Sequence, residues 1–83
     1  MRQGSFFPRE ITSDVPQVTM TGCELVRVEQ HQGLIAYQPE QIVFRTSLGR
    51  LTVTGSGLHF RRYSAADAVL AGCVDSIVVG GSA

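Results

Sequence analysis

The sequence contains no lysine and no tryptophan, and it has only two cysteines and three prolines in 83 residues. Seven arginines balance seven acidic residues, so no net field draws the chain toward phosphate backbones or anionic lipid. No apolar run approaches the roughly 20 residues that a membrane-spanning helix requires. We therefore expect one small cytoplasmic domain, with no nucleic-acid partner and no direct insertion into a membrane.

The two cysteines, Cys23 and Cys73, lie outside any metal-binding pattern, because neither has a second cysteine or a histidine at ligand spacing. We expect buried, reduced thiols, and the sequence leaves open whether the two pair. The N-terminus lacks a basic region followed by an apolar stretch and a cleavage site, so the sequence does not support secretion.

Short runs rich in β-branched residues begin at Gln17 and alternate apolar with polar positions, which is typical of half-buried strands. Glycines interrupt these runs at the spacing of tight turns. The pattern predicts an all-β fold, a small antiparallel meander forming a single-domain sandwich or roll. We expect an N-terminal arm over residues 1–16, the β domain over 17–79 and a flexible tail over 80–83.

The middle of the chain predicts a hairpin. In residues 42–46 the apolar side chains Ile42 and Phe44 share one face, and residues 51–54 alternate in the same way. The link at 47–50 contains Gly49, which can adopt a positive φ without steric cost. These two runs are expected to pair antiparallel.

Other turns are predicted from glycine and polar residues. Residues 30–33 are expected to close a hairpin with a return strand over 34–37, and residues 55–57 to form the next turn. Residues 64–67 are expected to be a turn, followed over 68–79 by two short strands or one bent strand.

No catalytic motif is present: the sequence has no phosphate-binding loop, no zinc-protease pattern and no nucleophile elbow. His31 lies in a polar turn and His59 alternates with outward residues, so both are expected at the surface. We predict that the chain is not an enzyme and has no catalytic residues, no cofactor and no metal.

The predicted sheet itself favours binding to other proteins. A small open sheet leaves edges that can pair with another strand, as a homo-oligomer or with a different protein. The charged residues of the predicted strands form an outward stripe that is either a protein interface or only a protective surface. The possible interface consists of Arg27, Glu29, Arg45, Arg61 and Arg62.

A small β-domain that binds single-stranded nucleic acid is the alternative, because such domains place aromatic side chains beside cations. Two groups loosely fit this description: the aromatics Tyr37, Phe44, Phe60 and Tyr63, and the cations Arg45, Arg61 and Arg62. Phe44 and Phe60 are expected on core faces, however, and the zero net charge removes the main electrostatic contribution to such binding.

The order and spacing of several turn-and-strand motifs resemble the YabP/YqfC family of sporulation proteins, and YqfC most closely. The resemblance covers about residues 14–79, and the motifs are Val15–Gly22, Val28–Gly33 and Arg45–Gly55. It implies a role in endospore formation in the mother cell. It also implies a partnership with a membrane protein like YqfD, at the membrane around the forespore. The family offers no catalytic residues to assign.

Overall fold

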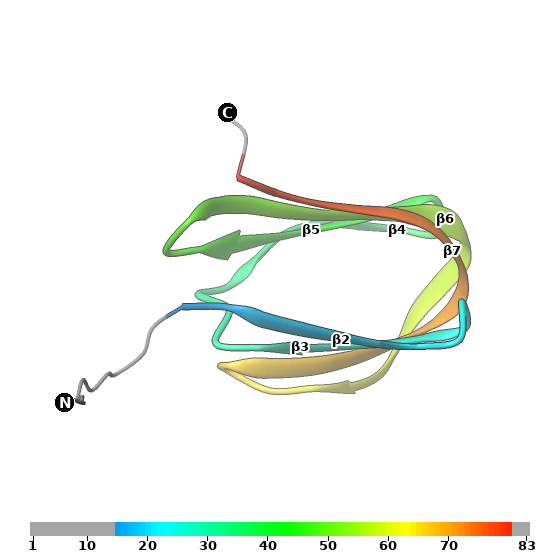
Figure 1. Ribbon diagram of the computed structural model, residues 1–83, viewed down its shortest axis with the longest axis horizontal. Coiled ribbons are helices and arrows are strands. Elements are labelled where there is room, and N and C mark those ends of the chain that lie inside the picture. The colour runs from blue at the N-terminus through cyan, green and yellow to red at the C-terminus, as the bar shows by residue number, and fades with distance from the viewer. Residues whose placement is uncertain (1–14, 81–83) are drawn as a thin grey trace, which may run out of the picture.

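The computed structural model describes residues 15–80, which form six β-strands and no helix (Figure 1). Two strands are much longer than the others, and they carry the main curvature of the molecule. The strands are β2 (Gln17–Thr21), β3 (Leu25–Glu29), β4 (Leu34–Gln38), β5 (Gln41–Thr46), β6 (Gly49–Tyr63) and β7 (Asp67–Gly80).

All six strands belong to one antiparallel sheet in the order β2-β3-β7-β6-β5-β4. Strands β4 to β7 form a meander, and β3 pairs with the other side of β7. Figure 1 shows the sheet folded over into two layers, with β6 and β7 running through both. The predicted all-β antiparallel fold is therefore confirmed.

The hydrophobic core lies between the two layers. Val26 and Val28 of β3, which alternate with outward polar residues, are fully buried. They pack against the inward faces of β5, β6 and β7, as the period-two pattern predicted for residues 42–46 and 51–54. The buried core consists of Val26, Val28, Ile42, Phe44, Leu51, Val53, Leu58, Ala68, Leu70 and Val74.

The turn predicted at residues 55–57 is wrong, because β6 continues through these glycines and bends there instead. The pairing of β6 with β7 shifts register between Thr54 and Gly55 and between Ser56 and His59, as at β-bulges, which bend strands. Strand β7 bends beside it, so residues 68–79 are part of one bent strand. Glycine permits the bend because the two backbones lie very close there.

The hairpin predicted around residues 30–33 is also wrong. Strand β3 pairs with β2 and β7, whereas β4 pairs with β5, so the segment crosses from one layer to the other. Backbone bonds fix the crossing at both ends: the His31 amide donates to the Ala66 carbonyl (2.9 Å), and the Arg45 amide donates to the Gly33 carbonyl (2.8 Å). Polar residues indicate a turn, but they do not indicate whether the strands before and after it pair with each other.

The cysteines are not buried as expected. Cys23, in the turn between β2 and β3, and Cys73, at the bend of β7, are both exposed free thiols. Most of the predicted arm over residues 1–16 and of the tail over 80–83 lies outside the described residues. Within residues 15–80, no helix has the length and hydropathy needed to cross a membrane.

Candidate functional site

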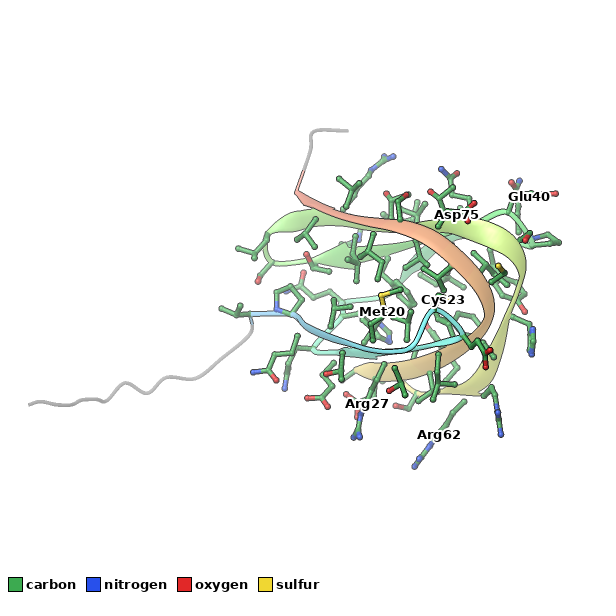
Figure 2. The ribbon with its side chains drawn as sticks, turned by 45° about the vertical axis from the view of Figure 1, so that its right-hand side comes forward. Met20, Cys23, Arg27, Glu40, Arg62 and Asp75 are labelled. Carbon is green, nitrogen blue, oxygen red and sulfur yellow. The ribbon has the colours of Figure 1, made fainter. Side chains whose placement is uncertain are left out.

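All of the predicted interface residues except Arg45 lie on the outer surface of the layer that contains β2 and β3. Arg27 of β3 is directly opposite Val69 of β7, and Val69 is opposite Arg62 of β6. The three residues therefore form a row across three neighbouring strands. Val69 alternates with buried Ala68 and Leu70, so the row faces outward. Figure 2 shows Arg27 and Arg62 pointing away from the sheet on this side.

A third arginine, Arg61, lies on the same surface as Arg62 because of a β-bulge in β6. The register of β6 against β7 shifts between Phe60 and Arg62, leaving Arg61 as the extra residue. A bulge sets two residues against one, and here it turns Arg62 outward beside Arg61, although strict alternation after the inward Phe60 would place Arg62 on the inner face. Arg61 lies with Leu25 and Ala71 around one depression and with Arg62 and Val69 around another. We call this surface, formed by Arg27, Arg61, Arg62, Leu25 and Val69, the arginine face.

The arginine face is shallow and grooved. A depression of about 130 Å³ lies between Arg27 and Arg62, with Ser64, Asp67 and Val69 completing its wall. The neighbouring depression beside Arg61 and Arg62 has an apolar floor of two half-buried side chains, Leu25 and Val69. Guanidinium groups around an apolar floor are suited to contact the surface of a partner protein, because arginine combines bidentate hydrogen bonding with packing of its apolar stem.

Of the three arginines of this face, only Arg27 forms an ion pair with an acidic residue among residues 15–80. Arg27 Nε lies 2.9 Å from Glu29 Oε2, and this exposed ion pair contributes little stability. Among residues 15–80 no acidic side chain forms an ion pair with Arg61 or Arg62. Two positive charges are therefore available to the carboxylates of a partner, with which arginine forms bidentate hydrogen bonds.

Arg45 is not part of this face. It lies on β5 in the other layer, opposite Arg50 of β6, so the predicted five-residue stripe is divided between two surfaces. The apolar floor residues Leu25 and Val69 were missed by the sequence analysis. The alternation of Val69 with the buried positions on either side could have identified it as an outward residue. No local pattern indicated that β3 pairs with β7.

His31 was expected in a solvated turn and is instead buried, with 3% of its surface exposed. Its Nδ1 atom accepts a hydrogen bond from the Gly33 amide at 3.0 Å. In the neutral ring Nε2 therefore carries the hydrogen and donates it to the Ser64 carbonyl at 3.0 Å. The ring also packs against Phe44 and Tyr63. His31 thus joins the crossing between the layers to the turn between β6 and β7.

We expect His31→Ala to lower the free energy of unfolding by about 3 kcal/mol, because it removes ring packing and leaves buried backbone groups without partners. His59→Ala is the matched control, since His59 is exposed, and it should change stability by less than about 0.5 kcal/mol. Urea unfolding followed by circular dichroism measures both values. Equal losses would contradict the structural role of His31.

The aromatic residues of the nucleic-acid alternative are only partly brought together. Tyr37 of β4 stacks on Phe60 of β6 with 4.7 Å between ring centroids, and Phe60 contacts Tyr63. The Phe60 amide also donates to the Tyr37 hydroxyl at 3.3 Å. Phe44 is fully buried and takes no part in a surface. These rings contact one another and close one side of the folded sheet.

The described residues thus define a small β-sheet domain whose outer surface carries a grooved arginine face. Within residues 15–80 no three histidine, cysteine or acidic side chains gather in a way that could hold a metal ion. The model of the YabP family matches residues 13–82, and the chain belongs to the YabP family. No curated protein and no solved structure matches the chain.

Proposed function

We propose that the chain acts in endospore formation as a non-enzymatic assembly protein that binds a protein partner through its arginine face. Membership of the YabP family is consistent with a role in sporulation. The observation that supports the binding mode is the bulge that places Arg61 beside Arg62, both without an acidic partner among the described residues. Unpaired guanidinium groups beside an apolar floor favour binding to an acidic protein surface.

The partner that we propose is a sporulation membrane protein like YqfD, with this chain as the YqfC-like member of the pair. The chain would then act in the mother cell and be held peripherally at the membrane around the forespore. Its positive face would contact a carboxylate-rich region of the partner. Binding by this mode needs neither a cofactor nor a catalytic group.

Substitutions on the arginine face test this function in the spore-forming host. We expect Arg61→Glu with Arg62→Glu to lower the count of heat-resistant spores as far as deletion of the gene does, because the reversed charges repel an acidic partner. Arg45→Glu with Arg50→Glu is the matched control, since it makes the same charge change on the other layer. It should leave the count unchanged.

Normal sporulation in the deletion strain would contradict the sporulation role itself. Normal sporulation with the Arg61 and Arg62 double variant, at equal protein level, would contradict only the binding face. Single-stranded nucleic acid is the alternative ligand, and an oligonucleotide titration separates the two, because phosphate binding weakens steeply as salt rises. Binding through an apolar floor with a few charge pairs depends less on salt.

A further inference from the structure

One side of the folded sheet lies between the edge strand β2 and the C-terminal half of β7, and no backbone pairing among residues 15–80 joins these two strands (Figure 1). We call it the open side. Val18 and Met20 of β2 are opposite the buried residues Val28 and Val26, so they point inward. Figure 2 shows Met20 pointing from β2 into the space between the layers. Although it faces inward, Met20 is 44% exposed, and Val79, the inward residue of β7 opposite buried Leu51, is 45% exposed. Among residues 15–80, no strand therefore covers the core on this side.

Both strands at the open side present unpaired backbone. Within residues 15–80, β2 pairs only with β3, and β7 beyond Val74 pairs only with β6. Residues 17–21 and 76–80 contain neither a charged side chain nor a proline. Natural sheet edges are usually protected from pairing by charge, proline or a cover, so an uncharged edge beside exposed core residues favours strand addition. The opposite side is closed by the stacked rings of Tyr37 and Phe60.

We propose that the open side binds a second copy of this chain, with β2 of one copy antiparallel to β2 of the other. The sequence of β2 is self-complementary in this arrangement. A two-fold axis at Thr19 sets Thr19 opposite Thr19 on the outer face and Val18 opposite Met20 on the inner face. Threonine pairs and apolar pairs are favourable neighbours across antiparallel strands.

The same two-fold axis turns the two open sides toward each other. Each copy then covers the exposed inward residues of the other, including Met20 and Val79, and the two folded sheets continue as one. The interface is isologous, so it closes at the dimer and does not propagate. The added burial also suits a domain of this size, because small domains gain proportionally little from their own core. This proposal does not depend on the arginine face.

Size-exclusion chromatography with light scattering tests the dimer. The wild-type chain should have the mass of a dimer, and Met20→Arg should have the mass of a monomer, because it sets a charge against the apolar interior of both copies. Ile35→Arg is the matched control on the opposite edge strand β4, where Ile35 is 38% exposed, and it should stay dimeric. A monomeric wild type would overturn the proposal, as would a Met20→Arg dimer.

Two oppositely charged variants at Thr19 test the dimer independently, even if Met20→Arg fails to fold. Thr19 is exposed on the outer face, so lysine is tolerated by the monomer. Two lysines facing each other at the two-fold axis should give a monomer, and mixing Thr19→Lys with Thr19→Asp should restore a dimer with one copy of each. Dimerisation of Thr19→Lys alone would refute the pairing. The Arg61 and Arg62 double variant should remain dimeric, so failure here and failure of the proposed function can be distinguished.

Discussion

Gly72→Ala should lower the free energy of unfolding by about 3 kcal/mol or more, a large part of the stability of a domain of this size. Gly72 lies in the bend of β7 with φ at +136°, and a Cβ atom there would be 2.7 Å from the Gly57 carbonyl oxygen. The nearest atoms belong to the backbone of β6, which cannot move aside without changing the bend. The substitution therefore combines an unfavourable φ with a steric clash.

Gly33→Ala is the control for the effect of φ alone. Gly33 has a φ of +130°, close to that of Gly72, but nothing lies within 4 Å of a Cβ atom placed there. We expect Gly33→Ala to cost about 1–2 kcal/mol, which is the conformational part only. Urea unfolding of both variants measures the difference. Equal costs would show that the close approach of β6 and β7 does not limit the bend.

Phe44→Ala should lower the free energy of unfolding by about 3–5 kcal/mol, the range for a large aromatic removed from a packed core. Phe44 is fully buried between the layers. Its ring contacts His31 with centroids 5.0 Å apart and Phe60 with centroids 6.1 Å apart, so truncation also loosens the aromatic group that closes one side of the sheet.

Leu48→Ala is the control for Phe44→Ala, because Leu48 lies in the turn between β5 and β6 and is mostly exposed. It should change stability by less than about 0.5 kcal/mol. Thermal unfolding followed by circular dichroism gives both values. A loss below about 1 kcal/mol for Phe44→Ala would contradict the packing of this core.

The sequence correctly predicted those features of the fold that depend on neighbouring residues alone. The alternation around Val26 and Val28 indicated the buried face of β3, and the glycine in the link at 47–50 indicated the β5–β6 hairpin, which the structure confirms. The two wrong turns share one cause. At residues 30–33 and 55–57 the same polar and glycine signals mark a crossing and a bend, and only long-range pairing distinguishes these from hairpins.

Only part of the candidate site was predicted from the sequence, because the rest depends on long-range strand pairing. Alternation placed Arg27 and Arg61 on outward faces, but the register between β3, β7 and β6 brings them together, and no local pattern specifies that register. Arg62 joins them through a bulge, which shifts the alternation by one residue. The burial of His31 was missed because its partners, Ser64 and Ala66, lie more than 30 residues away in the sequence.

The two proposed surfaces serve different contacts on one small domain. The open side of the folded sheet would join two copies, and each copy would keep its arginine face on the outside of the sheet, away from the two-fold axis. Such a dimer would present two arginine faces to the proposed membrane partner. Two weak contacts on one dimer strengthen each other when the partner is clustered in a membrane.

The most direct test of the proposed function is isothermal titration calorimetry of the purified chain with the soluble region of the YqfD-like protein from the same organism. We expect the wild-type chain and the Arg45→Glu, Arg50→Glu control to bind. We expect the affinity of the Arg61→Glu, Arg62→Glu variant to be weaker by about tenfold or more. Equal binding by all three proteins would contradict the arginine face, and no binding by the wild-type chain would contradict the proposed partner.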